Sequence, residues 1–377
     1  MRSSNSNPDR SLCALVLCCA GSTFVGGGDL RTFDDPEFDI QPYNRTLARI
    51  EALDRPVVAA LHGTAVGAGF ELALACHYRV ALPGTRLGFP EIQVGVLPGS
   101  LGTQRLPRLV PLSTALDMML SGRLINAESA LSLGLLDKIC TLSDARDAGF
   151  QYVKSLLSAG RGSRPTAAMF VRSGGLGADY FANKLGEVDK TQSAYPSARA
   201  IVECVQATTS MSFEEGGRLE AAHFETCRRS SQSRAMRHLF FAEREAGQVS
   251  GLLQHLSPRP IRKIGIVGAG TMGGGIAMNF ANIGLVTVLL EAKPEPLERV
   301  LGTIRSNYAA SVTKGKLTQE EMQQRMGCLK GTLDDEELAD CDLVIEAVFE
   351  DMTLKQECVA WATSASLAQS WPPIPPH

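Results

Sequence analysis

A glycine-rich turn between two apolar segments constrains the fold of this chain more than any other feature. The apolar run 56–61 predicts a buried strand, and the run 70–76 predicts a helix. The small residues of 63–69 lie between them and allow backbone N–H groups to approach a ligand closely. At a helix start these groups lack intrahelical partners, and the helix dipole favours negative charge there. Because Glu71 follows in the first turn, this segment predicts an anion site beside a carboxylate that can move a proton.

A second strand-to-glycine turn precedes this one, and a second carboxylate follows it. The apolar run 12–17 predicts a buried strand that leads into the glycine-rich residues 21–30. Downstream, Glu91 lies in the segment 87–99, which is rich in glycine and proline. Either turn alone is more typical of an ordinary α/β protein, in which Glu71 would only stabilise a helix start. Together, the two turns and the two carboxylates predict one acid/base site.

The second half of the chain carries a dinucleotide-binding pattern. Residues 263–267 predict a buried strand, 268–273 read G-x-G-x-x-G, and 274–283 predict a helix. The next predicted strand, 286–290, ends in Glu291. The glycines allow a tight turn and close approach of a pyrophosphate, and the acid suits a ribose hydroxyl. The motif alone is weak, but strand, motif, helix, strand and acid in this order favour a dinucleotide site.

Composition excludes several classes of protein. A hydrophobic content of 44% and a charged content of 20% are ordinary for a globular protein. The formal net charge of −3 argues against a general nucleic-acid binder. The ten cysteines include no C-x-x-C pair, which predicts reduced, mostly buried thiols and no metal site. No run approaches the ~18 apolar residues of a membrane-spanning helix. The run 12–20 resembles a short signal peptide, but a core strand is the favoured interpretation.

The middle of the chain predicts mostly helices. Residues 42–61 predict a helix that leads into the strand at 56–61, and residues 78–82 predict another strand. Residues 160–195 are glycine-rich in part and predict a looser segment with surface loops. Further helices are predicted over 112–121, 127–136, 153–159, 198–205 and 213–247.

The first half of the chain resembles the enoyl-CoA hydratase/isomerase (crotonase) family. The resemblance covers roughly 12–145 and is carried by 24–30, 63–72, 89–99 and Gly102-Thr103-Gln104-Arg105-Leu106, in one unbroken order.

This resemblance implies a site and a substrate. A 2-enoyl-CoA thioester carbonyl would bind between the backbone N–H groups of Gly26 and Ala68. Glu71 would activate water to attack C3, and Glu91 would give a proton to C2. The same carboxylates could shift a 3-enoyl double bond to the 2-position.

The second half resembles the NAD-binding domain of 3-hydroxyacyl-CoA dehydrogenases, and residues 341–351 match a further parallel strand and its exit loop. The resemblance implies NAD as cofactor, although Lys355 alone could equally be a solvated helix lysine. The implied contacts are Gly268, Gly270, Met272, Gly273, Glu291, Ala347, Glu350 and Lys355.

The expected architecture is α/β with three parts. Residues 1–195 are expected to form an N-terminally shortened crotonase domain, 196–257 a helical linker, and 258–377 a C-terminally truncated Rossmann-type NAD-binding domain. The prolines of 256–260 predict a stiff boundary. This order resembles the bifunctional enzymes of fatty-acid β-oxidation, which implies acyl-CoA substrates and a peroxisomal location. The family's Ser-Lys-Leu-type C-terminal address is absent here, so a cytoplasmic location is the alternative expectation.

Two departures from the family shape the expected activity. The family has strands and a helix before the turn 24–30 that have no counterpart here. After Cys358 the resemblance fades into a tail that looks unstructured, and none of the six histidines lies in the family's dehydrogenase context. We therefore expect hydration, with NAD binding but no hydride transfer. The alternatives are an inactive product that binds acyl-CoA, NAD or a partner chain, and a plain NAD-dependent oxidoreductase whose first half is a scaffold.

Overall fold

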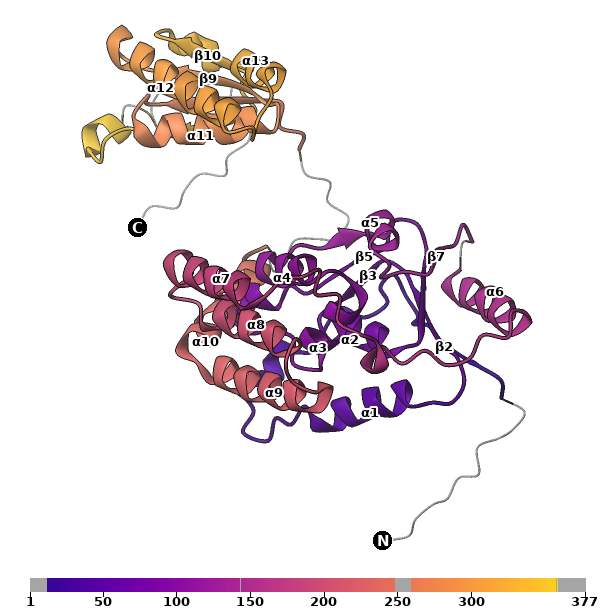
Figure 1. Cartoon of the computed structure of the whole chain (residues 1–377). Coiled ribbons are helices and arrows are strands. Elements are labelled where there is room, and N and C mark those ends of the chain that lie inside the picture. Colours follow the sequence, from indigo (N-terminus) through magenta and orange to yellow (C-terminus); the bar gives the residue numbers. More distant parts are fainter. Residues whose placement is uncertain (1–11, 143, 248–258, 357, 359–377) are drawn as a thin grey trace. The chain divides into compact units, whose positions relative to one another are not determined.

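The chain forms two compact units, Met1–Ser250 and Gly251–His377 (Figure 1). The structure, a computed structural model, describes residues 12–142, 144–247, 259–356 and 358. The predicted tail after Cys358 and the predicted boundary at 256–258 lie outside these residues. None of the helices that the structure describes combines the length and apolar character needed to cross a bilayer.

The first unit contains two sheets. The larger has four parallel strands in the order β1 (Leu15–Leu17), β2 (Val57–Leu61), β4 (Tyr78–Ala81) and β7 (Lys138–Ile139). In the smaller, β3 (Thr64–Val66) pairs parallel with β5 (Arg86–Gly88), which pairs antiparallel with β6 (Ile125–Asn126). Strand β2 is central and fully buried, whereas β1 is half-buried because it lies at the edge. The buried strand predicted over 12–17 is therefore shorter and more exposed than expected.

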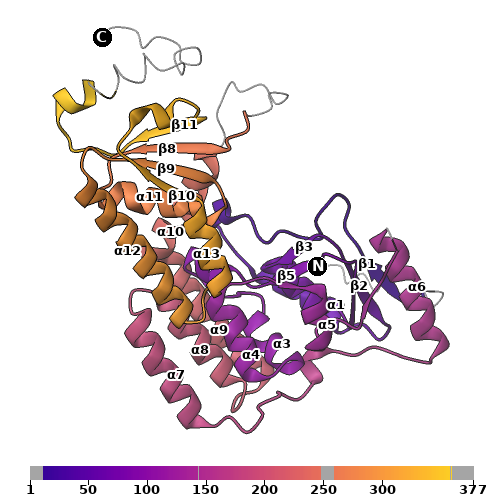
Figure 2. The same ribbon diagram turned by 90° about the horizontal axis from the view of Figure 1, so that it is seen from above.

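Side chains of β2 alternate between two cores. Val58 and Ala60 pack in one core with residues of α6, and Val57, Ala59 and Leu61 face the main core. This alternation follows from the two-residue period of a strand. In Figures 1 and 2, α6 lies at one end of the unit and α7–α10 lie at the other, with the sheets between them. The helices are α1 (Gln41–Glu51), α2 (Ala68–Ala75), α3 (Gly102–Leu109), α4 (Leu112–Ser121), α5 (Ala127–Ser132), α6 (Ala145–Ser158), α7 (Ala178–Thr191), α8 (Pro196–Ala207), α9 (Phe213–Arg229) and α10 (Ser231–Ala246).

The structure corrects two predictions in the helical region. The looser segment predicted over 160–195 contains α7, whose Phe181 and Val188 are buried two turns apart on one face. The helix predicted over 213–247 is two helices, because Ser230 ends α9 and its side chain caps the start of α10.

Helices α8 to α10 belong to the first unit. The apolar side chains of Ile201 and Val205 on α8 and of Phe224 on α9 are buried in its main core. The predicted linker over 196–257 is therefore, through Ala246, an integral layer of this unit, since its apolar faces have partners there.

The second unit is a four-stranded parallel sheet with helices. Its strand order is β10 (Leu329–Thr332), β9 (Val286–Leu290), β8 (Lys263–Val267) and β11 (Leu343–Glu346). Ile264 and Ile266 face the core formed with α11 (Thr271–Asn282), α12 (Pro294–Thr313) and α13 (Gln319–Gly327), which lie together beside the sheet in Figure 2. The bounds predicted for β8 and β9 agree with the structure, and α12, α13 and β10 are additional to the predicted elements.

A buried ion pair joins α1 to α3 in the first unit. Glu51 Oε2 accepts hydrogen bonds from Arg105 Nη2 at 2.8 Å and Nε at 3.2 Å, and its Oε1 accepts from the Ala167 N–H at 2.8 Å. Arg105 Nη1 also donates to the Ser100 carbonyl at 2.9 Å, so the pair fixes the residues that precede α3.

We predict that Glu51→Gln destabilises the first unit by about 3–5 kcal/mol, because it leaves the Arg105 guanidinium buried without a counter-charge. Urea unfolding followed by circular dichroism measures this loss as a lower midpoint. Asp29→Asn, which removes an exposed partner of Arg31, serves as the matched control and should leave the midpoint nearly unchanged. Equal midpoints for the two variants would contradict the prediction.

Candidate active site

The two predicted glycine turns lie directly against each other. A Cβ atom added to Gly69 would lie 2.5 Å from both the Val25 Cβ and the Val25 carbonyl oxygen, so only glycine fits there. A short parallel bridge between Val25 and Ala65 continues this contact, with the Val66 N–H donating to the Val25 carbonyl at 3.1 Å. The segment with Gly26 is therefore held beside the start of α2.

Two backbone donors at this junction lack partners. Ala68 is the first residue of α2, so its N–H has no intrahelical acceptor. Within the described parts of the chain, neither the Gly26 N–H nor the Ala68 N–H donates a hydrogen bond. The Ala68 carbonyl is fixed by Tyr43, whose hydroxyl donates to it at 2.6 Å. This arrangement can hold a small anionic oxygen.

Glu71 lies in the first turn of α2 and is 2% exposed. Its Oε1 accepts hydrogen bonds from the N–H groups of Ser100 at 2.6 Å and Gly102 at 2.9 Å. Burial raises the pKa of Glu71 to about 7, while these two N–H groups and the Arg105 guanidinium act in the opposite direction. Both of these N–H groups donate to Oε1, which leaves Oε2 as the oxygen that can accept a proton.

Glu91 begins the short 3-10 turn Glu91–Val94 and faces the start of α2. A Cβ atom on Gly67, the residue that precedes α2, would lie 3.2 Å from Glu91 Oε1. Glu91 Oε2 is buried and has no hydrogen-bond partner among the described residues. Burial and then the charge of Glu71 raise the pKa of Glu91 well above its usual range, which favours the protonated form of this carboxyl.

The structure adds a carboxylate that the sequence reasoning missed as a site residue. Glu220 on α9 is 1% exposed, and the pKa of its carboxyl is raised to about 8 by burial and by the charge of Glu71. The sequence shows it only as one charge in a mixed helix. A usable signal was the adjacent pair Gly216–Gly217, because glycine inside a helix often marks a close approach.

In the second unit, the three motif glycines meet three different requirements. Gly268 has φ +105°, and a Cβ atom there would lie 2.6 Å from the Ala347 carbonyl oxygen. A Cβ atom on Gly273 would lie 1.9 Å from the Gly268 carbonyl oxygen, which keeps α11 tight against the turn. Around Gly270 nothing lies within 4 Å, which leaves room for a pyrophosphate.

The other predicted NAD contacts differ in exposure and in the partners that they bind. Glu291 Oε2 accepts a hydrogen bond from the Ala269 N–H at 2.9 Å, so the acid lies beside the glycine turn. Met272 is 70% exposed at the start of α11. Lys355 Nζ forms ion pairs with Glu350 at 2.7 Å and with Glu346 at 3.7 Å, so it is a paired lysine.

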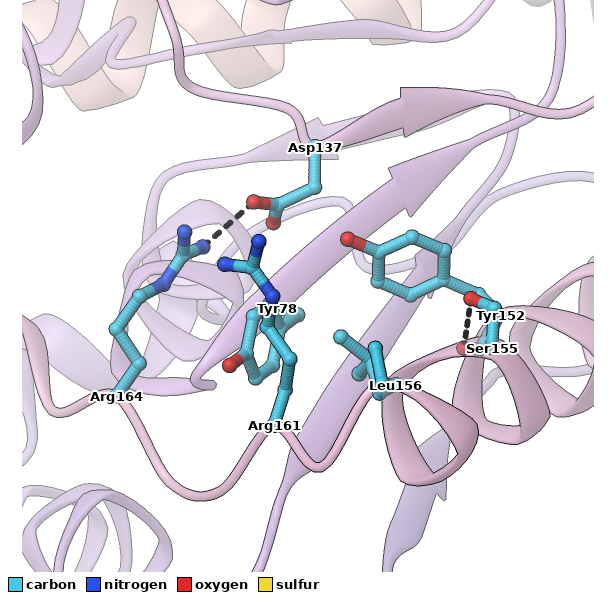
Figure 3. A pocket seen from close by; sticks show the side chains of 8 residues that line it. Tyr78, Asp137, Tyr152, Ser155, Leu156, Arg161 and Arg164 are labelled. Atoms are coloured by element: carbon cyan, nitrogen blue, oxygen red, sulfur yellow. Dashed lines mark hydrogen bonds and ion pairs between the residues drawn. The ribbon is translucent and has the colours of Figure 1, made fainter.

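Two pockets lie away from these carboxylates. One of about 240 Å³ lies between β4 and α6, where Arg164 donates to Asp137 at 2.7 Å and stacks 4.4 Å from the centre of the Tyr78 ring (Figure 3). The other, of about 470 Å³, is lined by residues that include Arg108 and Phe170. Neither contains Glu71, Glu91, Gly26 or Ala68.

Comparison with known families finds a match in each half of the chain. Residues 4–171 match the family model for enoyl-CoA hydratase/isomerase, and residues 263–369 match that for the NAD-binding domain of 3-hydroxyacyl-CoA dehydrogenase. Both matches extend further than the resemblance seen in the sequence, which covered roughly 12–145 and faded after Cys358. The chain therefore consists of a crotonase-like domain followed by a Rossmann-type NAD-binding domain, which confirms the predicted fold class and the NAD-binding domain. Coenzyme A thioesters fit the first family as substrates.

Solved structures show similarity to each half. The chain is 33% identical to 3-hydroxybutyryl-CoA dehydrogenase from Escherichia coli, over 28% of this chain and 23% of that chain, with a TM-score of 0.28. It is also 33% identical to (S)-3-hydroxybutyryl-CoA dehydrogenase from Ralstonia eutropha, over 28% and 38%, with a TM-score of 0.28. An enoyl-CoA hydratase subunit I from Geobacillus kaustophilus is 24% identical over 67% and 82%, with a TM-score of 0.38. The chain thus spans only 23% and 38% of the two dehydrogenases.

We predict that Gly268→Ala weakens NAD binding about 10-fold or more, because an alanine at positive φ is strained and its methyl group meets the Ala347 carbonyl. Isothermal titration calorimetry with NAD measures the change. Gly275→Ala is the matched control, since a Cβ atom there meets nothing within 4 Å and should leave the affinity unchanged. Wild-type affinity in Gly268→Ala would show that this turn does not hold the dinucleotide.

Proposed function

We propose that this chain, which joins an enoyl-CoA hydratase/isomerase-type domain to an NAD-binding domain, hydrates 2-enoyl-CoA to 3-hydroxyacyl-CoA in fatty-acid β-oxidation. The observation that carries the proposal is the pair Glu71 and Glu91, two carboxyl groups buried at the start of α2 in different surroundings. Glu71 accepts two backbone N–H groups, Glu91 Oε2 has no hydrogen-bond partner among the described residues, and burial raises the pKa values of both. Environments that separate two such pKa values assign one group as base and the other as acid.

The geometry supports each step of this reaction. The unpartnered N–H groups of Gly26 and Ala68 would bind the thioester oxygen and stabilise the charge that develops on it. Glu71, when ionised, takes a proton from water while the water oxygen bonds to C3. Electrons of the double bond move toward the thioester, and Glu91 gives its proton to C2. Water is thus added across the double bond. Glu71 then holds an extra proton and Glu91 lacks one, and proton exchange with solvent restores both groups before the next turnover.

The same site supports a second proposed activity, isomerisation of a 3-enoyl-CoA to a 2-enoyl-CoA. In this reaction a proton leaves C2 and a proton is delivered to C4. One carboxyl group can carry the proton if it is ionised when the 3-enoyl-CoA binds, the opposite of the protonated state that donates in hydration. We assign this role to Glu91, because its buried Oε2 has no hydrogen-bond partner in the described structure. The oxyanion donors would be the same.

We predict that Glu71→Gln and Glu91→Gln each lower kcat for hydration of crotonyl-CoA by about 10²–10⁴-fold, since each removes a proton-transfer group. Absorbance of the conjugated thioester measures the rate. The wild-type rate should rise as pH increases through about 7, because Glu71 must lose its proton to act as base. That rise should be absent from the residual rate of Glu71→Gln.

Glu128→Gln on α5 is the matched control, because Glu128 is exposed, and it should retain the wild-type rate. Near wild-type kcat in either glutamine variant would remove that residue from the mechanism. A wild-type chain that binds a coenzyme A thioester but shows no hydration would favour the binding-only alternative.

For the second unit we propose NAD binding without hydride transfer by the 377-residue chain. The matched contacts, from Gly268 to Lys355, all lie within the described residues of the second unit, whereas the resemblance provides no catalytic histidine. NAD is preferred over NADP because a 2′-phosphate would face Glu291.

We predict that incubation with a 3-hydroxyacyl-CoA and NAD gives no NADH absorbance at any pH, while calorimetry with NAD shows binding. Glu291→Gln should reduce the preference for NAD over NADP. A heat signal that does not come from binding at this site would be the same in both proteins. Steady NADH production would show that the chain contains a complete dehydrogenase site.

A further inference from the structure

Helix α9 supplies a buried carboxylate to the turn that holds Glu71. Glu220 Oε1 accepts a hydrogen bond from the Leu101 N–H at 2.6 Å. Its Oε2 accepts from the Thr103 N–H at 2.9 Å and from the Thr103 hydroxyl at 2.5 Å. Both oxygens of this carboxylate are therefore used by one turn at the start of α3.

Successive N–H groups of this turn alternate between two carboxylates. Ser100 and Gly102 donate to Glu71, whereas Leu101 and Thr103 donate to Glu220. The alternation requires an unusual backbone, and Leu101 has φ +70°, the one positive φ outside glycine among the described residues. A leucine occupies this region only when its surroundings hold it there. The carboxylate of Glu220 is one of the groups that hold it.

Packing on α9 supports the same conformation. A Cβ atom on Gly217 would lie 2.6 Å from Leu101 Cδ2, and one on Gly216 would lie 2.1 Å from Gln104 Oε1. The glycine pair lies one turn before Glu220, and it lets the residues around Leu101 approach the helix closely. The carboxylate and the glycine pair thus act on the same turn.

We propose that Glu220 is a positioning residue for hydration: by accepting the N–H groups of Leu101 and Thr103, it fixes the turn whose Ser100 and Gly102 N–H groups hold Glu71. This inference rests on the proposed function of Glu71 as the base. It assigns a role in the reaction to α9, within the segment that the sequence presents as a linker.

The effect of Glu220 reaches the reaction through geometry and charge. With the turn displaced, Glu71 would lose donors to Oε1 and the orientation of Oε2, and a displacement of about 1 Å at such a group can cost about 100-fold in rate. The thioester donors Gly26 and Ala68 do not contact Glu220, so substrate binding should be little affected. Among the charged and titratable groups, the Arg105 guanidinium acts on Glu71 and the charge of Glu71 acts on Glu220. The two carboxylates in turn act on their neighbours: Glu71 on Tyr43, Glu220 on Cys204, and both on Glu91.

The test measures kcat and KM for crotonyl-CoA in the full chain with Glu220→Gln. A glutamine has one acceptor oxygen, so it cannot satisfy both Leu101 and Thr103. We expect kcat to fall at least 10-fold while KM stays within about twofold of the wild type, in line with the loss of a group aligned for the reaction alone. Glu214→Gln, an exposed change on the same helix, is the matched control and should leave both constants unchanged.

Amide hydrogen exchange of Ser100 and Gly102 provides a readout that does not depend on activity. Their N–H groups donate to Glu71 and not to Glu220. Faster exchange of these two N–H groups in Glu220→Gln would therefore show that Glu220 keeps them in place for Glu71. If the wild type hydrates no enoyl-CoA, the proposed function fails, and unchanged exchange would separately overturn the positioning role. If Glu220→Gln does not fold, Thr103→Val removes one donor to Glu220 and should lower kcat and speed exchange in the same direction. Unchanged kcat and exchange in a folded variant would overturn the proposal.

Discussion

Burial of carboxylates against the start of α3 is the constraint on which the first unit depends. A buried carboxylate is costly unless N–H or O–H groups donate to it, and a helix start offers N–H groups that have no intrahelical partners. Here successive N–H groups from Ser100 to Thr103 donate alternately to Glu71 and Glu220. The ion pair of Arg105 with Glu51 then ties α3 to α1, and its bond to the Ser100 carbonyl fixes the turn from a third direction. The positive φ of Leu101 is the backbone conformation in which this turn makes these hydrogen bonds.

The sequence predicts those elements whose pattern is local. The strands β2, β8 and β9 are short apolar runs bounded by turns, and their predicted bounds agree closely with the structure. Helix α7 was missed because glycines before it and sparse apolar residues within it weaken the periodicity. The linker assignment could not be tested from the pattern alone. An amphipathic helix looks the same whether it joins two domains or covers one core, and only the tertiary partners of side chains such as Phe224 decide.

The site residues divide in the same way. Some lie in short sequence motifs, and others meet only when the chain folds. The two glycine turns and the carboxylates of Glu71 and Glu91 could be predicted because each lies in a compact motif, although their catalytic roles remain predictions. Glu220 could not, because it meets Leu101 across 119 residues of sequence. Its only local signal is the pair Gly216–Gly217, which is unfavourable in a helix unless another backbone or side chain needs the space.

Three carboxyl groups buried near one another cannot all be ionised at neutral pH, because burial raises the pKa of each and the charge of Glu71 raises those of Glu91 and Glu220 further. Glu71 has two N–H donors and the nearby Arg105 guanidinium, and its pKa is about 7. Glu220 has three donors but lies in the field of Glu71, and its pKa is about 8. Glu91 has a buried oxygen without any partner in the described structure, and burial and the charge of Glu71 raise its pKa well above the usual range. The donors in the turn before α3 therefore favour the ionised forms of Glu71 and Glu220, whereas Glu91 Oε2 has no such donor among the described residues.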